Sequence, residues 1–166
     1  MNKKLIAILF MMAPLAIFAQ KFGHLNSADI IQAMPEYTTA QTEIQNLEKQ
    51  MTNELQMMEA ELAKKSETYE KEKATLPANI QQRREQELQE LYGKMQQYYQ
   101  TSPQELAQTS QEKMASLTEK VTKAIKEVGV AGGYLYIFDI ASGIPYISET
   151  LSTDVTAQVK AKLGIK

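Results

Sequence analysis

The side chains that could carry out acid–base or nucleophilic chemistry are few in this sequence, and they form no recognisable catalytic set. The chain of 166 residues contains one histidine, His24, and no cysteine. Thiol catalysis and cysteine-based metal sites are therefore excluded, and a Ser-His-Asp site would need His24, which we expect to be a structural strand residue. Gly132-Gly133 lacks the Lys-Ser/Thr of a phosphate loop and is expected to separate a helix from a strand. We predict no catalytic, metal or cofactor site and no enzymatic activity.

Side chains suited to binding are more frequent than side chains suited to catalysis. The candidate contacts for a partner are methionines and tyrosines in the middle of the chain: Met57, Met58, Tyr69, Tyr92, Tyr98 and Tyr99. Adjacent residues point about 100° apart on a helix, so these side chains cannot all face one narrow seam. Met58 and Tyr98 are expected to pack in the seam, while the others stay partly exposed as an adaptable apolar surface. Arg83 and Arg84 are either a solvated pair or a contact for anions such as lipid headgroups.

A long helical arm, predicted over residues 36–128, must position these side chains. The segment contains a single glycine, and its apolar residues recur in steps of three and four over residues 37–62, as in a heptad seam. Pro77 predicts a turn, with the tip near 76–79, after which the apolar stripe resumes. We therefore expect an antiparallel helical hairpin whose tip has little to bury and is mobile.

A helix-start signature interrupts the second half of this arm. Ser102, Pro103 and Glu105 have the positions of a cap, a first-turn proline and a capping-box acid. A proline inside a helix costs about 3 kcal/mol, so we expect a kink or a new helix start there. The return segment is also longer than the outgoing one, about 49 against about 40 residues, and the surplus must be absorbed by a bend or by overlap with the rest of the chain.

Short strand-like segments bracket the arm. Phe22–Asn26 precedes it, and Tyr134–Phe138, which is apolar on both faces, follows it as a strand expected to be buried on both sides. Ile144–Ser148 is predicted to return as a further strand, and Asp154 to cap a short amphipathic helix that ends at Gly164. Strands so far apart in sequence can share a sheet only if the arm folds back on itself.

The predicted fold class is α+β, with a small β-containing oligomerisation body and a long antiparallel coiled-coil hairpin. The body combines residues 20–35 with 129–166, and about 55 residues cannot build much of a core without self-association. Its residues expected to form the oligomer are Phe22, Leu25, Tyr134, Leu135, Tyr136, Ile137 and Phe138. A molecule with so much surface and so little core is expected to work by enclosing a partner.

Met1–Ala19 has the pattern of an export signal rather than of a retained membrane anchor. Lys3 and Lys4 precede an apolar run that is short for a membrane span, and Ala19 suits the position before the cleavage site. Without these two lysines the chain has 16 basic and 20 acidic residues, and the arm alone has 12 and 16. Such a mildly acidic surface argues against nucleic acid as a partner.

The two ends of the exported chain carry a family resemblance. Its segments are Lys21–Ser27 at the front and Ala124–Val128, Tyr134–Asp139, Ile144–Tyr146 and Asp154–Thr156 at the back. With these segments the sequence resembles the Skp/OmpH family of periplasmic chaperones, whereas the arm matches only in length and character. The resemblance implies a homotrimer whose barrel-like body carries three helical arms around a cavity. It also implies ATP-independent holding of unfolded outer-membrane β-barrel proteins.

We therefore predict a periplasmic, homotrimeric holdase chaperone, exported through a signal peptide cut near Ala19. Its predicted clients are unfolded outer-membrane β-barrel proteins, and Arg83 and Arg84 would add at most a weak contact with a membrane surface. The family's well-known members are strongly basic and this chain is acidic, so the resemblance leaves open whether this chain binds lipopolysaccharide. The alternative is a structural coiled-coil or adaptor protein of the cell envelope, which would ignore unfolded barrels and bind one folded partner.

Overall fold

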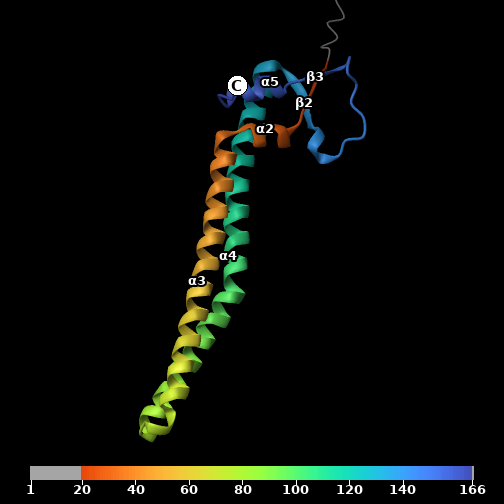
Figure 1. Ribbon diagram of the computed structural model, residues 1–166. Coiled ribbons are helices and arrows are strands. Elements are labelled where there is room, and N and C mark those ends of the chain that lie inside the picture. The colour runs from red at the N-terminus through yellow and green to blue at the C-terminus, as the bar shows by residue number, and fades with distance from the viewer. Residues whose placement is uncertain (1–19, 166) are drawn as a thin grey trace, which may run out of the picture. The chain divides into compact units, whose positions relative to one another are not determined.

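The computed structural model describes residues 20–165 (Figure 1). The predicted export signal, Met1–Ala19, lies outside the described residues. The elements in chain order are β1 (Lys21–Leu25), α2 (Ser27–Ala33), α3 (Pro35–Glu72), the 3₁₀ turn η1 (Lys73–Thr75), α4 (Ala78–Gly132), β2 (Tyr134–Asp139), the 3₁₀ turn η2 (Ile140–Ser142), β3 (Ser152–Asp154) and α5 (Thr156–Lys162). They group into a sheet unit, which is the described residues up to Ile30 with those from Thr122 onward, and a hairpin unit, Ile31–Val121.

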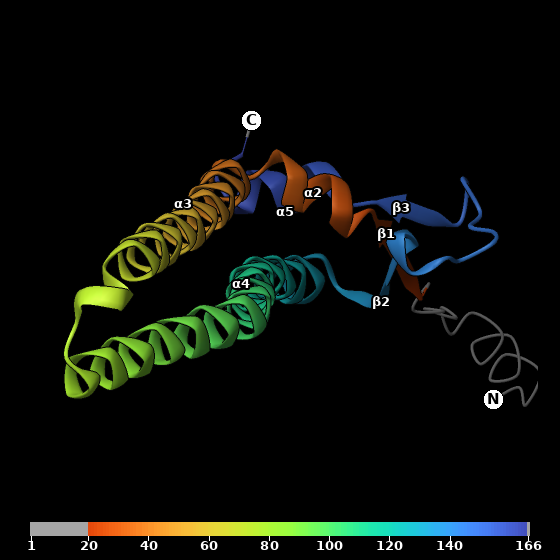
Figure 2. The same ribbon diagram turned by 60° about the horizontal axis from the view of Figure 1, so that its bottom comes forward.

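A three-stranded parallel sheet forms the centre of the sheet unit. β1 lies between β2 and β3 (Figure 2), and the register places Phe22 opposite Tyr136 on one side and Ser152 on the other. The chain between β1 and β2 contains both long helices, so the prediction that strands on either side of the arm share a sheet is confirmed. A Cβ on Gly23 would lie 3.2 Å from the Ile137 side chain, so the close approach of β1 and β2 favours glycine at this position.

Side-chain caps fix the junctions between strands and helices. Asn26 Oδ1 accepts hydrogen bonds from two backbone amides in the first turn of α2, at 3.1 and 3.3 Å, and so caps this helix. Asp139 accepts from the Ser27 amide (3.0 Å), the Ser27 hydroxyl (2.5 Å) and the Ala141 amide (3.0 Å). Partial burial disfavours the charged form of Asp139, but these hydrogen bonds outweigh it and hold the pKa of the carboxyl below its usual value. One carboxylate thus ties the start of α2 to the end of β2.

α3 and α4 form the predicted antiparallel hairpin. α3 starts at Pro35, where the missing N–H is tolerated because first-turn amides have no intrahelical partner. Every seam position predicted over residues 37–62 is buried or half-buried, while the positions between them are almost all exposed. No helix within residues 20–165 combines the length and apolar content needed to cross a membrane. With a mostly helical chain, a long hairpin and a small sheet, the predicted α+β class is confirmed.

α4 does not restart at Pro103, contrary to one of the two predicted outcomes. The helix continues from Ala78 to Gly132 with the proline inside it. The Ser102 hydroxyl donates to the Tyr98 carbonyl one turn earlier, so the capping signature is used as an internal helix contact instead. The helix tolerates the proline by bending, and Figure 1 shows α4 changing direction in its green stretch.

The surplus length of the return helix is absorbed mainly by overlap with the sheet unit. Lys120 pairs with Glu36 near the start of α3, and α4 continues for 12 more residues, to Gly132, of which those from Thr122 on belong to the sheet unit. From the Tyr69–Glu85 hydrogen bond to this ion pair α3 advances by 33 residues and α4 by 35. The bend therefore absorbs only a small part of the surplus.

The C-terminal strand is not where the sequence predicted it. Ile144–Ser148 forms no strand, and the strand that pairs with β1 is Ser152–Asp154, which runs parallel to it. Pro145 lacks the N–H that a ladder needs, whereas Val155 donates its N–H to the His24 carbonyl at 2.9 Å and is fully buried. Burial of Val155 thus brings residues 152–154, rather than 144–148, against β1.

α5 follows the predicted pattern. Asp154 Oδ1 accepts a hydrogen bond from the Thr156 amide at 2.8 Å, which caps the helix. Val155 and Val159 have no exposed surface, and Gly164 ends the helix with a φ of 73°. The apolar face of α5 therefore completes the core of the sheet unit.

Candidate interaction surfaces

The outer face of β2 carries uncovered apolar side chains. Leu135, Tyr136 and Phe138 are 51%, 58% and 44% exposed, so little of the described chain packs on them. The prediction that this strand is buried on both faces is therefore wrong for the single chain. Phe22 stacks on Tyr136 with ring centroids 6.4 Å apart, and Tyr136 lies 6.0 Å from Phe138. The result is a row of aromatic rings across two neighbouring strands.

A concave apolar surface of about 400 Å³ adjoins this row. It is lined mainly by Phe22, Phe138, Ile144, Tyr146, Ile147 and Leu151. Tyr146 and Leu151 are each 78% exposed. Neither residue is among those predicted for the oligomerisation body, although the apolar character of residues 144–151 is a signal for such a surface.

The other residues predicted for the body lie closer to the core. Leu25 is buried and Ile137 is half-buried. The Lys21 ammonium lies 4.3 Å from the centre of the Tyr134 ring and donates to the Gly132 carbonyl at 3.0 Å. A cation suits this position because the C-terminal end of α4 carries partial negative charge.

His24 lies in β1, as expected for a structural residue, and it contacts a serine. Its Nδ1 is 2.8 Å from Ser152 Oγ across the β1–β3 pair. Asp154 is opposite His24 in the register, but its carboxylate caps α5, and the hydrogen bonding from Thr156 lowers its pKa. The acid is thus used as a helix cap rather than to orient the imidazole. Within residues 20–165 no group of three or more His, Asp or Glu residues is arranged to hold a metal ion.

Half of the candidate contact residues in the hairpin are exposed. Met57, Tyr92 and Tyr99 are 73%, 50% and 69% exposed. Met58 and Tyr98 are half-buried in the seam, as their spacing predicted. The three exposed side chains are therefore the ones within reach of a partner.

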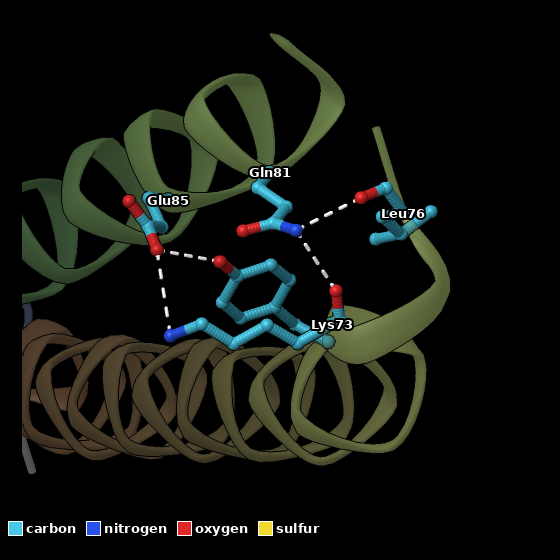
Figure 3. Close-up of polar contacts among 5 residues, drawn as sticks. Lys73, Leu76, Gln81 and Glu85 are labelled. Carbon is cyan, nitrogen blue, oxygen red and sulfur yellow. Dashed lines mark hydrogen bonds and ion pairs between the residues drawn. The ribbon is translucent and has the colours of Figure 1, made fainter. Parts of the chain in front are cut away.

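The tip of the hairpin is held together more closely than the sequence predicted. Tyr69 is 5% exposed, and its hydroxyl donates to Glu85 at 2.5 Å, which raises the pKa of Tyr69 to about 12. The Lys73 ammonium lies 3.7 Å from the same carboxylate, and the Gln81 amide donates to the Lys73 and Leu76 carbonyls at 3.0 and 2.8 Å (Figure 3). The expectation that Tyr69 stays partly exposed is wrong, because its ring is covered by these polar partners.

Arg83 and Arg84, the candidate anion contact, share one carboxylate. Arg83 Nε lies 3.7 Å and Arg84 Nη1 3.2 Å from Glu87. An anion bound at this pair would therefore compete with Glu87. All three side chains are largely exposed, so these ion pairs are weak and screened by salt.

Two shallow grooves follow one another along the middle of the hairpin. The lining of the first, about 190 Å³, includes Leu55, Glu59, Tyr92, Met95, Gln96 and Tyr99. The lining of the second, about 240 Å³, includes Glu48, Met51, Leu55, Tyr99, Pro103 and Leu106. Because Leu55 and Tyr99 belong to both, the two grooves are continuous. The tyrosines were predicted as contacts but the groove was not, because the groove depends on how far α4 is shifted along α3.

Comparisons with known proteins match most of the chain. The sequence model of the family described as "Outer membrane protein (OmpH-like)" matches residues 21–163. A "Chaperone protein Skp" from Yersinia enterocolitica is 26% identical over 150 residues, which cover 89% of this chain and 91% of that protein. A protein of the same name from Vibrio cholerae is 29% identical over 136 residues, which cover 80% of this chain and 78% of that protein.

A solved structure has the same fold. A crystal structure described as an OmpH-like outer membrane chaperone from Caulobacter crescentus matches with a TM-score of 0.71. The match covers 87% of this chain and 83% of that one. Since the two sequences are only 16% identical, this likeness supports the fold alone.

Proposed function

Because the family match spans residues 21–163, this chain belongs to the OmpH-like outer membrane protein family, and from this premise we propose that it is a holdase chaperone of the cell envelope. Relatives named Chaperone protein Skp support a chaperone role. The proposed activity is to bind unfolded outer-membrane β-barrel proteins and to prevent their aggregation without ATP. The proposal includes no catalytic step.

The surface of the hairpin is the observation that carries this proposal. It offers isolated exposed side chains, Met57, Tyr92 and Tyr99, and shallow grooves on an otherwise polar helix pair. Such contacts are adaptable and individually weak, which suits clients of many sequences. Several weak contacts can still retain a client when more than one arm surrounds it, because the effective concentration is high.

We propose further that the working particle is a homotrimer, as the family resemblance implies. In this proposal residues 20–35 and 129–166 form the oligomerising part, and residues 36–128 form the client-holding arm. The aromatic row on β1 and β2 and the adjoining concave surface support it, since exposed apolar patches and unpaired strand edges favour association. A second copy of this chain is the partner that would cover them.

The proposed place of action is the periplasm, after export and removal of Met1–Ala19. A membrane surface would be at most a weak contact, because Arg83 and Arg84 already share Glu87. The excess of acidic over basic residues also disfavours binding to anionic lipids.

Dilution of urea-unfolded outer-membrane β-barrel proteins, followed by turbidity, tests the holding activity. We expect the mature protein to suppress aggregation of several unrelated barrels without nucleotide. A variant with Met57, Tyr92 and Tyr99 all changed to Ala should hold these clients less well while its oligomer stays intact. If the barrels aggregate equally fast with and without the protein, the holdase function is wrong and the adaptor alternative takes its place.

Sedimentation at micromolar concentration tests the assembly. We expect three chains per particle. Phe138→Asp places a charge in the proposed interface and should reduce the particle size, whereas Lys123→Asp, on an exposed face of α4, should leave it unchanged. A stable, folded monomer of the unaltered mature chain would contradict the proposed trimer.

A further inference from the structure

The two continuous grooves in the middle of the hairpin form one surface, which we call the mid-hairpin groove. Its walls are Glu48, Leu55 and Glu59 of α3 and Tyr92, Tyr99 and Pro103 of α4. In each helix the first and second of these residues are seven positions apart and the second and third are four apart, a spacing that places them on one face. The groove is therefore a strip along one side of the helix pair.

The seam of the hairpin leaves apolar surface accessible along this strip. Its apolar seam residues Met51 and Leu106 are half-buried, as are Leu47 and Leu62 farther along the seam. No side chain of residues 41–68 or 70–116 is fully buried. Pro103, which cannot donate a backbone hydrogen bond, lines the strip from inside α4. The groove thus lies where two helices pack without closing a core between them.

The charge of the groove distinguishes it from the other hollows of the hairpin. Its only charged lining residues are the carboxylates Glu48 and Glu59. Neither forms an ion pair with another of residues 20–165. By contrast, the other hollows of the hairpin are lined by both acidic and basic residues. The basic ones are Lys64, Lys65 and Arg84 in the hollow near the tip, and Lys113 and Lys120 in the hollow at the other end.

We propose that the mid-hairpin groove is a subsite for client segments in which a basic residue adjoins an aromatic or large apolar one. This proposal rests on the proposed holdase function and names a preference within it. Leu55 gives the apolar side chain a floor, and the faces of Tyr92 and Tyr99 attract a cation. Glu48 and Glu59 pair with the basic residue at either end of the strip, and they repel segments that carry carboxylates.

A pair of short peptides tests the preference. Both carry tyrosines at the same positions in a Gly/Ser background, with Arg beside each tyrosine in one peptide and Glu in the other. Fluorescence anisotropy with the assembled mature protein should show the Arg peptide binding about fivefold tighter or more. The difference should shrink as salt approaches physiological ionic strength. Equal binding of the two peptides would overturn the proposal.

Matched variants locate the effect in the groove. The double variant Glu48→Gln, Glu59→Gln should remove most of the preference for the Arg peptide. The double variant Glu70→Gln, Glu119→Gln removes the same charge from exposed positions outside the groove, and it should keep the preference. Tyr99→Ala should weaken the Arg peptide about fivefold, and Gln56→Ala, at an exposed position outside the groove, less than about twofold. Circular dichroism and sedimentation show whether each variant keeps its fold and assembly. Equal losses from the two double variants would mean that long-range charge, not the groove, sets the preference.

The same experiments separate this inference from the function on which it rests. If the protein suppresses barrel aggregation but binds both peptides equally, the holdase function is supported and the groove preference is wrong. If it binds the Arg peptide through Glu48 and Glu59 but does not suppress aggregation, the groove preference is supported and the holdase function is wrong.

Discussion

The two units of the chain distribute apolar surface differently. The sheet unit buries Leu25, Ile30, Ala124, Val128, Val155 and Val159, and it exposes Val130, Leu135, Tyr136, Phe138, Ile140, Tyr146 and Leu151. The larger hairpin unit buries only Met34, Ala40, Tyr69, Leu117 and Val121, and it exposes Met57, Tyr92 and Tyr99. Both buried and uncovered apolar side chains are therefore denser in the sheet unit.

This difference separates two kinds of association. A dense apolar patch can bury enough area to fix one partner in one orientation. Isolated apolar side chains on a polar helix pair give contacts too weak to do so, but they can exchange between many partners. The sheet unit is thus suited to permanent assembly, and the hairpin unit to reversible binding.

The largest expected effect comes from a cavity in the core of the sheet unit. Ile30 has no exposed surface, so Ile30→Ala should lower the free energy of unfolding by about 2–5 kcal/mol. Met57→Ala, at an exposed position of the hairpin, should change it by less than about 0.5 kcal/mol. Urea unfolding at a fixed chain concentration measures both, since assembly couples stability to concentration. Similar losses would mean that the two units are packed alike.

Removing the interior proline should strengthen the hairpin. Pro103→Ala restores a backbone donor and should stabilise α4 by about 1–3 kcal/mol. Pro35→Ala is the matched control, because Pro35 occupies a first-turn position and its replacement should change stability by less than about 1 kcal/mol. Hydrogen exchange of the α4 amides around residue 103 is the measurement. Faster exchange in Pro103→Ala would show that the packing requires the bend.

Features that depend on neighbours in sequence could be predicted from the sequence. The turn at Pro77, the cap at Asp154 and the helix end at Gly164 each follow from the conformational preferences of one residue type. The seam of α3 follows from apolar spacing alone. The exposure of Tyr92 and Tyr99 follows from the same rule, since they lie off the seam.

Features that depend on distant neighbours could not be predicted. The position of β3 depends on the burial of Val155 together with Val159 of α5, which the alternation of residues 144–148 does not indicate. The exposure of β2 depends on whether another element packs on its outer face, which no local pattern specifies. The mid-hairpin groove depends on the shift between α3 and α4, which no local pattern specifies.

Acid should weaken the sheet unit through Asp139. Its pKa is lowered in the folded chain, so its stabilising effect is complete well above the usual carboxyl pKa of 3.8 and is lost as the pH falls through the lowered value. Asp139→Asn should cost about 1 kcal/mol at neutral pH, by weakening the cap of α2, and should flatten the loss of stability in acid. Glu149→Gln, at an exposed position, is the control. Urea unfolding between about pH 6 and pH 2 measures the slope, and an unchanged slope in Asp139→Asn would show that other carboxylates dominate.

The smallest expected effect is local and concerns the tip. Tyr69→Phe removes the hydroxyl that bonds Glu85, so amides of residues 65–90 should exchange several-fold faster while global stability hardly changes. Tyr92→Phe is the control, because the Tyr92 hydroxyl contacts only Gln96 on its own helix and the residue is half exposed. Tyr69 is the only fully buried side chain between residues 41 and 116, so its contacts are the ones that protect the amides of the tip. If Tyr69→Phe leaves the exchange rates of these amides unchanged, the buried ring rather than the hydrogen bond stabilises the tip. Only Tyr69→Ala would then accelerate exchange.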